Sequence, residues 1–529
     1  MTRRFRNPVL PGFYPDPSVC RVGEDYYLVN STFEYFPGLP IHHSRDLVHW
    51  RPLGYVLDRP EQLPLQGIRP SGGLYAPTIR YHDGTFYVVC TLVDGTSRSG
   101  NFVVTATDPA GPWSSPHYLE DAPGFDPSLF FDDDGRVWFT GSRPAAEPEY
   151  EGHTEIWMRE LDLDTMRLVG ETFVLTSGAL RGAIWAEGPH VYKVDGQYYL
   201  VIAEGGTGHD HAVTVHRADT VTGPYQGNPR NPVLTHRHLG REHPIVGTGH
   251  GDLIQTQTGE WWMVLLAMRP YGGYFYNLGR ETFLAPVTWE EGWPVVSPGI
   301  GQVQHHYPFP DLPPSPWPTQ PACDHFDAPV LAPQWNMLRT PDEPFWSLQE
   351  RPGHLRLRVQ PWTLADWATP SFVGRRQQHP SFTARLAVDF TPAKPGEYAG
   401  LALLYNSDFH LCLLIGAGAD TTGRTLRLTR RAHGVEETIA EQVLPPDAPS
   451  RILLAAEARG QHLALSYAVE PERWHRIGPE VDTRFLSPSV AGGFTGVYVG
   501  MYATSTGSPS DSVADFDWFE YQGQDHTPA

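Results

Sequence analysis

The segment IWAEGPHVYKVDGQYYLVIAEGG, residues 184–206, carries the pattern that decides the fold. A glutamate, Glu187, stands directly before two apolar, aromatic-rich strands joined by Asp195-Gly196, a dipeptide typical of tight β-hairpin turns. Four other segments repeat the pattern of a lead residue, a short strand, a turn with glycine and a second strand. They begin at Asp16, Tyr75, Asp126 and His250.

The five copies follow one another at intervals of about fifty to sixty residues, a period that indicates a β-propeller or a similar array. Five copies predict five blades, with the first strand of each blade lining a central channel. The five lead residues then occupy the same end of five equivalent strands. Three carboxylates, an imidazole and an aromatic ring are therefore expected to converge at one mouth of the channel.

The length and charge of the chain restrict what it does. A chain of 529 residues is consistent with two large domains. The formal net charge of −21 argues against nucleic-acid binding, which needs a basic surface, and against docking on anionic membranes. The four cysteines are far apart and show no CxxC spacing, which argues against a metal cluster or a disulfide framework.

The N-terminus, MTRRFRNPVLPGFYPDP, has no apolar region behind its basic start, so it does not resemble a secretory signal. No apolar run approaches the roughly 20 residues that a membrane helix needs. We therefore expect a cytoplasmic protein without a membrane partner. A homo-oligomer is compatible with the sequence.

The chain divides into two all-β regions. Residues 1–300 show short alternating strands and glycine-rich turns, residues 301–322 form a proline-rich linker, and residues 323–529 are β-rich without the blade pattern. Nine segments of the last region alternate at period two, which predicts a two-sheet sandwich of the jelly-roll or lectin type. The glycines flanking Phe494 in GGFTG suit a loop that reaches over a neighbouring surface.

The convergent carboxylates indicate chemistry on glycosidic bonds, which are cleaved with one carboxyl as acid and another as base or nucleophile. Blades three and four are adjacent, so Asp126 lies near Glu187 and is expected to raise its pKa. Blades one and four are not adjacent, which favours the separation of roughly 6.5–9.5 Å between carboxyls used by inverting enzymes.

Each of these residues also has a purely structural interpretation. Asp16 in PDPS and Asp126 in FDPS are both compatible with a turn cap, and Glu187 with an ion pair to an arginine. The occurrence of all three at equivalent repeat positions favours the catalytic interpretation. His250 is compatible with a buried hydrogen-bonded histidine, with a cation or water ligand, or with a sugar contact.

The motifs GFYPDPSVCRVGEDYYLVNSTFEYFPGLPIHHSRDLVHW, GGLYAPTIRYHDGTFY, FDPSLF, AEGPHVYK, GHGDL and LGRETFLAPVTWEEGWPVV closely resemble glycoside hydrolase family 43. The chain is most similar to its β-xylosidase and α-L-arabinofuranosidase members with a C-terminal β-sandwich. The resemblance implies a five-bladed propeller and hydrolysis with inversion. It also implies that Asp16 is the general base, Glu187 the general acid, and Asp126 the third acid that orients Glu187 and raises its pKa.

The resemblance adds binding residues. Arg280 in LGRET is expected to contact sugar hydroxyls, the alternative being an ion pair with Glu281. Phe33 is expected to form an apolar wall, Tyr75 to take a place where relatives often carry tryptophan, and Phe494 to close the pocket from the sandwich. For both phenylalanines the alternative is ordinary core packing.

The resemblance and the carboxylate pattern together predict an inverting exo-glycosidase that releases terminal xylose from β-1,4-xylo-oligosaccharides. An α-L-arabinofuranosidase or a bifunctional enzyme is the alternative, because the short segment YGGYFYNL, residues 271–278, replaces a longer insert of some relatives. A non-catalytic carbohydrate-binding propeller is a remote alternative. The chemistry requires no cofactor, although a structural Ca²⁺ or another cation near His250 is compatible with the resemblance.

Overall fold

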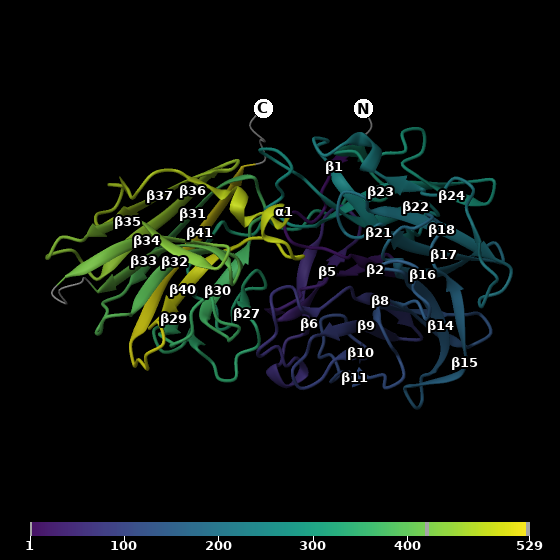
Figure 1. The fold of residues 1–529 in the computed structure, drawn as a ribbon, viewed down its shortest axis with the longest axis horizontal. Coiled ribbons are helices and arrows are strands. Elements are labelled where there is room, and N and C mark those ends of the chain that lie inside the picture. Colours follow the sequence, from purple (N-terminus) through teal and green to yellow (C-terminus); the bar gives the residue numbers. More distant parts are fainter. Residues whose placement is uncertain (1–2, 418–422, 525–529) are drawn as a thin grey trace.

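The computed structural model describes residues 3–417 and 423–524, which form a five-bladed β-propeller and a β-sandwich lying side by side (Figure 1). The predicted all-β fold is confirmed. Helical structure in the described residues is confined to four short pieces: η1 (Pro60–Gln62), η2 (Arg237–Leu239), η3 (Thr483–Leu486) and α1 (Pro488–Ala491). No helix in these residues is long and apolar enough to cross a membrane.

Five antiparallel sheets make the blades. The first contains β2 (Ser18–Val22), β3 (Asp25–Val29), β5 (Gly38–Ser44) and β6 (Arg51–Leu57), and the second β7 (Gly73–Leu74), β8 (Thr78–His82), β9 (Thr85–Val93), β10 (Gly100–Ala106) and β11 (His117–Tyr118). The third contains β12 (Phe125–Phe131), β13 (Val137–Pro144), β14 (Thr154–Asp162) and β15 (Arg167–Thr176). The fourth contains β16 (Glu187–Val194), β17 (Gln197–Glu204), β18 (Ala212–Ala218), β19 (Gln226–Gly227) and β20 (Leu234–Thr235), and the fifth β21 (Val246–Gln255), β22 (Trp261–Met268), β23 (Glu281–Glu290) and β24 (Trp293–Val296).

The hairpin that decides the fold has the geometry its sequence predicts. Asp195 and Gly196 both adopt left-handed backbone angles, with φ of 50° and 80°, and the strands pair from Val194 opposite Gln197. Two successive left-handed residues make the turn whose twist matches that of the flanking strands. The register of the inner strand from Val194 back to His190 follows from this turn, and a register shift between His190 and Glu187 then displaces Glu187 at the end of the strand.

The proline-rich segment 301–322 lies along the propeller. Its strand β25 (His306–Pro308) pairs with the N-terminal strand β1 (Arg4–Arg6). Further on, the indole of Trp317 donates a hydrogen bond to the carbonyl of His49 and lies under the guanidinium of Arg51. The segment is therefore fixed to the propeller before the chain enters the sandwich.

The sandwich consists of two large sheets. One contains β26 (Cys323–Asp324), β28 (Trp346–Ser347), β29 (Leu355–Arg358), β31 (Ser381–Asp389), β36 (Arg451–Arg459), β37 (His462–Ala468), β38 (His475–Arg476), β39 (Val481–Asp482) and β41 (Val513–Gln524). The other contains β4 (Tyr35–Phe36), β27 (Asn336–Leu338), β30 (Ser371–Arg376), β32 (Tyr398–Asn406), β33 (Phe409–Ala417), β34 (Arg424–Ala432), β35 (Val435–Val443) and β40 (Tyr498–Thr504). All nine segments with period-two alternation are strands.

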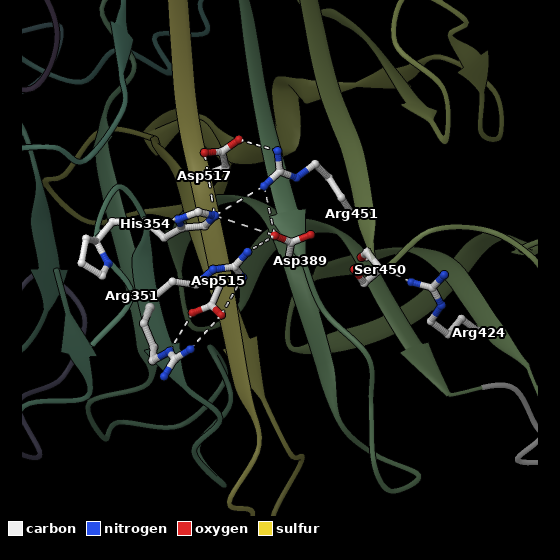
Figure 2. Close-up of polar contacts among 10 residues, drawn as sticks. Arg351, His354, Asp389, Arg424, Ser450, Arg451, Asp515 and Asp517 are labelled. Atoms are coloured by element: carbon white, nitrogen blue, oxygen red, sulfur yellow. Dashed lines mark hydrogen bonds and ion pairs between the residues drawn. The ribbon is translucent and has the colours of Figure 1, made fainter. Parts of the chain in front are cut away.

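One end of the nine-stranded sheet carries a network of charged side chains (Figure 2). Arg351 bridges Asp389 and Asp515, at 2.8 and 2.9 Å, and Arg451 pairs with Asp517 at 2.8 Å and with Asp389 at 3.1 Å. Each aspartate thus has an arginine partner. The network ties strands β31, β36 and β41 together.

The two domains share backbone and side-chain contacts. Strand β4, which lies between two strands of the first blade in the sequence, pairs with β27 of the sandwich. The guanidinium of Arg376 donates to the carbonyl of Phe13 at 2.7 Å, and the buried Arg339 donates to the carbonyl of Ile68 at 2.7 Å. These contacts therefore fix the position of the sandwich relative to the channel mouth of the propeller.

A buried polar network crosses the centre of the propeller. Asp252 of β21 forms an ion pair with Arg80 of β8 at 2.9 Å and accepts hydrogen bonds from Ser18 of β2 and Tyr192 of β16. Arg80 also contacts the imidazole of His190 at 2.9 Å. Burial opposes ionisation of Asp252, but the Arg80 charge and these donors hold its pKa far below the ordinary value. The ionised carboxylate connects inner strands of four blades.

Replacing Asp252 by asparagine is expected to lower the free energy of unfolding by about 3–5 kcal/mol, because Arg80 then keeps a buried charge without its partner. The thermal unfolding midpoint measured by calorimetry checks this. Asp134→Asn is the matched control, because Asp134 pairs with Arg136 at an exposed turn. Equal midpoints for the two variants would contradict a stabilising role for the buried pair.

Candidate active site

The structure brings all eight predicted site residues to one pocket at the channel mouth. Five of them are the lead residues of the blades, and three come from elsewhere in the chain. The lining comprises Asp16, Phe33, Tyr75, Ala76, Phe125, Asp126, Glu187, Thr207, His211, His250, Leu266, Arg280 and Phe494. The catalytic and binding roles expected for the eight residues stay predictions.

The lead residues owe their orientation to irregular backbone at the ends of the inner strands. Asp16, Asp126 and His250 have left-handed φ angles of 51°, 52° and 49°. Strands β12 and β16, which contain Asp126 and Glu187, each have a register shift at the lead residue. Such bulges turn a side chain out of the alternation of its strand. Left-handed non-glycine residues are costly and gather at functional sites.

Asp16 is held at both carboxylate oxygens. The guanidinium of Arg280 donates to its Oδ1 at 2.6 Å, and the hydroxyl of Ser31 donates to its Oδ2 at 2.5 Å. All three side chains are buried. Two donors, one of them carrying a full positive charge, fix the orientation of this carboxylate.

Asp126 and Glu187 lie in an environment that favours protonation. Burial and the charge of Asp16 raise the pKa of Asp126 to about 8, against the opposing effects of Arg280 and of backbone N–H groups. Burial and the charges of Asp126 and Asp16 raise the pKa of Glu187 well above its usual range. Because the two carboxyls interact, they titrate as a pair, and a proton is retained in the pocket near neutral pH.

Arg280 pairs with Asp16, and the alternative partner Glu281 is engaged elsewhere. Glu281 forms an ion pair with Arg269 at 2.7 Å. Arg280 also donates to the hydroxyl of Thr207 at 3.2 Å. Its Nε atom is buried and has no hydrogen-bond partner within residues 3–417 and 423–524.

Three aromatic rings form one wall of the pocket. The ring centroid of Phe33 lies 5.2 Å from that of Tyr75 and 5.8 Å from that of Phe494. The backbone N–H of Phe494 donates to the Ser71 hydroxyl at 2.9 Å, which fixes the sandwich loop over the propeller. A Cβ at Gly493 would lie 2.5 Å from that hydroxyl oxygen, so the close approach of the loop requires glycine.

His250 lies among other imidazoles. Its ring centroid is 6.4 Å from that of His190, and burial lowers its pKa, so the ring is neutral. Burial also lowers the pKa of the neighbouring His211, to about 3. Calcium prefers oxygen ligands, and no group of three or more His, Cys, Asp and Glu side chains gathers as a metal site in the described part of the chain. The residues around His250 in this part of the chain therefore do not fit a calcium ion.

The sequence patterns did not single out Thr207, His211 or Phe125. Phe125 directly precedes Asp126, and Thr207 and His211 belong to the loop GGTGHDH that follows the second strand of the fourth blade. Only Phe125 had a neighbouring lead residue as a signal, because Thr207 and His211 lie 20 and 24 residues after Glu187. Their position in the lining depends on the conformation of the loop that carries them.

Comparison with known proteins agrees with this geometry. The family model "Glycosyl hydrolases family 43" matches residues 5–294, and "Beta xylosidase C-terminal Concanavalin A-like domain" matches residues 323–522. The chain is 43% identical to a xylosidase/arabinosidase of Butyrivibrio fibrisolvens, over 97% of this chain and 98% of the relative. It is 35% identical to a β-xylosidase of Bacillus subtilis, over 98% of this chain and 99% of the relative.

Solved structures show the same two-domain arrangement. A structure named "Bacteroides ovatus Xyloglucan PUL GH43B" superposes with a TM-score of 0.92 at 42% identity, covering 99% of this chain and 100% of the other. A xylan β-1,4-xylosidase from Bacillus halodurans superposes with a TM-score of 0.92 at 38% identity, covering 98% and 100%. The predicted combination of propeller and sandwich is thus confirmed by comparison as well.

Proposed function

Because this chain belongs to family 43 of the glycosyl hydrolases, we propose that its pocket releases the terminal xylose of β-1,4-xylo-oligosaccharides with inversion at the anomeric carbon. The observation that carries the proposal is the contrast between two carboxyls of one pocket. Asp16 is ion-paired with Arg280. Glu187, in contrast, is kept protonated because burial and the neighbouring carboxylates raise its pKa. Opposite protonation states are what an acid and a base need at the same pH.

Glu187 protonates the oxygen of the departing sugar. No hydrogen bond or ion pair engages its carboxyl among the described residues, and it retains some exposure in the pocket. A protonated carboxyl placed in this way is free to donate to a glycosidic oxygen. Asp126 supports it by disfavouring its ionisation.

Asp16 removes a proton from the water that attacks the anomeric carbon from the opposite face. The blade of Asp16 and the blade of Glu187 are not adjacent in the ring, which leaves room for sugar and water between the carboxyls. Arg280 and Ser31 fix the orientation of Asp16. The guanidinium of Arg280 also lines the pocket, where it is placed to contact a sugar hydroxyl.

The aromatic wall supports an exo mode of action. Phe494 comes from the sandwich and lies against Phe33 and Tyr75, while the backbone of its loop is held by Ser71. A pocket closed in this way accepts the end of a chain rather than its middle. The stacked rings offer an apolar surface to the C–H face of one pentose.

An α-L-arabinofuranosidase activity, alone or beside xylosidase activity, is the second candidate. Relatives of similar identity carry both names: one is a non-reducing end α-L-arabinofuranosidase of Bacteroides ovatus, 42% identical over 98% of this chain. The short segment 271–278 packs on the sandwich, where Tyr271 accepts a hydrogen bond from Gln377 and Asn277 donates one to Thr483. It is fixed in place and does not form a long flap.

Initial rates on 4-nitrophenyl β-D-xylopyranoside and 4-nitrophenyl α-L-arabinofuranoside test the substrate. Faster hydrolysis of the xyloside supports the first candidate, and faster hydrolysis of the arabinoside supports the second. Proton NMR of freshly released xylose tests the mechanism, because inversion of a β-xyloside yields the α-anomer first. Initial release of the β-anomer would overturn the inverting mechanism.

Replacing Asp126 by asparagine is expected to shift the alkaline limb of the pH–rate profile to lower pH. The acid Glu187 must be protonated, so the rate falls as the pH rises through its pKa. Removal of the Asp126 charge lowers that pKa, because this charge is one of the causes that raise it. Asp121→Asn, an exposed position in the connection that precedes the same blade, is the control. An unmoved alkaline limb in Asp126→Asn would contradict the assigned role.

A further inference from the structure

A second hollow lies on the sandwich, on the face of the eight-stranded sheet that is turned away from the nine-stranded sheet. Along β33, Leu411 and Leu413 pack between the sheets, whereas Cys412 and Leu414 point to the hollow. Its volume is about 240 Å³. It shares no lining residue with the catalytic pocket.

The floor of the hollow carries polar side chains in an ordered register. On strands β33 and β34, His410 lies opposite Arg431 and Cys412 opposite Thr429. These four side chains line the hollow together with Tyr398 of β32. A sheet face that only supported a core would present apolar residues at such positions.

Polar groups of this lining remain available to a ligand. The hydroxyls of Tyr398 and Thr429 take part in no side-chain hydrogen bond within the two described stretches of the chain. His410 is buried and binds the carbonyl of Asn406 through Nδ1 at 3.2 Å. Burial lowers its pKa to about 4, so the ring is neutral and its Nε2 is available as an acceptor. The hollow thus offers donors and acceptors that the fold does not use.

One wall of the hollow is a short loop flanked by two exposed tryptophans. Thr363, Leu364 and Ala365 line the hollow, and the neighbouring Trp362 and Trp367 are 48% and 53% exposed. The two half-exposed indoles thus belong to the same loop as this wall of the hollow.

The loop is held rigidly. The hydroxyl of Thr504 donates to the carbonyl of Trp362 at 3.0 Å, and the N–H of Leu364 donates to the Tyr502 hydroxyl at 3.2 Å. The indole of Trp367 donates to the Ser407 hydroxyl at 3.4 Å. Ordered tryptophans lose little conformational entropy when they bind a ligand.

We propose that this hollow is a second, non-catalytic binding site for neutral pentose oligosaccharides. A pentose ring has an apolar C–H face and a rim of hydroxyls. The polar groups of the hollow suit the hydroxyls, and the exposed indoles of Trp362 and Trp367 on the loop beside it offer apolar surface for the ring face. The assignment of the sugar class rests on the proposed function. The lining of the hollow includes two cationic side chains, Arg427 and Arg431, and one anionic side chain, Glu436. The hydroxyls of a neutral sugar can accept hydrogen bonds from the guanidinium groups and donate to the carboxylate.

A second site would retain a polysaccharide near the catalytic pocket. Binding at one site raises the effective concentration of the same chain at the other. The site therefore affects the KM for long substrates and leaves the hydrolysis of small chromogenic substrates unchanged.

The experiment is isothermal titration calorimetry of full-length Glu187→Gln with xylohexaose, in the presence and absence of the double substitution Trp362→Ala and Trp367→Ala. We expect two sites in the parent, and a loss of about tenfold or more in affinity at one of them in the double variant. Trp367→Phe, which retains an aromatic face, is expected to keep most of the affinity. Trp474→Ala, on the other sheet of the same domain, is the matched control.

A single site in the parent, or two unchanged sites in the double variant, would overturn the proposal. A second measurement separates the proposed glycosidase function from the proposed second site. It compares the hydrolysis of both nitrophenyl glycosides by the wild type and by the double tryptophan variant, both of which retain Glu187. Equal rates together with weakened xylohexaose binding support the second site. If the wild type hydrolyses neither glycoside, the proposed function fails, while the tryptophan dependence of binding still decides the fate of the second site.

Discussion

Replacing Glu187 by glutamine is expected to lower the turnover of xylobiose by about 10³-fold or more, because the departing sugar then leaves without a proton. General acid catalysis contributes about 10²–10⁴-fold. Glutamine has nearly the shape of glutamate, and no described hydrogen bond to the carboxyl is lost. The fold and the affinity for sugar are therefore expected to persist.

The loss depends on the leaving group, and this dependence identifies the acid. Nitrophenolate leaves readily without protonation, so the Glu187→Gln variant is expected to retain much more activity on 4-nitrophenyl β-D-xylopyranoside than on xylobiose. The measurement is the ratio of kcat/KM between variant and wild type on each substrate. Glu242→Gln, an exposed position, is the control. Equal losses on both substrates would remove Glu187 from the role of acid.

The fold was predictable because the repeat appears in local sequence. Each copy places a turn such as Asp195-Gly196 at a fixed distance from its lead residue, and the turn sets the register of the hairpin. Five equivalent hairpins then fix the positions of Asp16, Asp126 and Glu187 relative to one another. The convergence of the lead residues on one pocket follows from that symmetry and needs no knowledge of long-range contacts.

Contacts between distant segments were not predictable in the same way. The sequence left open whether Arg280 pairs with its neighbour Glu281; in the structure it pairs with Asp16, while Glu281 pairs with Arg269. The strand Tyr35–Phe36 extends a sheet of the sandwich although it lies within the first blade. Neither arrangement has a periodic signal, because the ion pair depends on how the first and fifth blades meet and the strand pairing on how the two domains dock.

The buried ion pair of Asp252 and Arg80 illustrates the same limit. The two residues lie in different blades, and neither stands at a lead position. Their strands were predicted to line the channel. Which side chains form an ion pair, however, depends on which of them meet across the channel. Propeller symmetry therefore predicts the site at the mouth better than the polar network below it.

Replacing Asp16 by asparagine is expected to lower turnover by about 10³–10⁴-fold on xylobiose and on 4-nitrophenyl β-D-xylopyranoside alike. The base acts on the attacking water, so a better leaving group does not compensate for its loss, in contrast to the Glu187 variant. The amide also leaves Arg280 with a buried charge and no ionised partner, so calorimetry must accompany the kinetics to show that the variant is folded.

Ser31→Ala is the matched control for this variant, because it removes one hydrogen bond to the same carboxylate and retains the Arg280 ion pair. We expect a much smaller loss of turnover from it, since the carboxylate that accepts the proton remains. A folded Asp16→Asn enzyme with losses that depend on the leaving group, or with activity near that of Ser31→Ala, would exclude Asp16 as the base. Losses of similar size on both substrates in Asp16→Asn would place Asp16 beside the attacking water. Together with leaving-group-dependent losses in Glu187→Gln, they give the arrangement that inversion requires, with base and acid on opposite faces of the sugar.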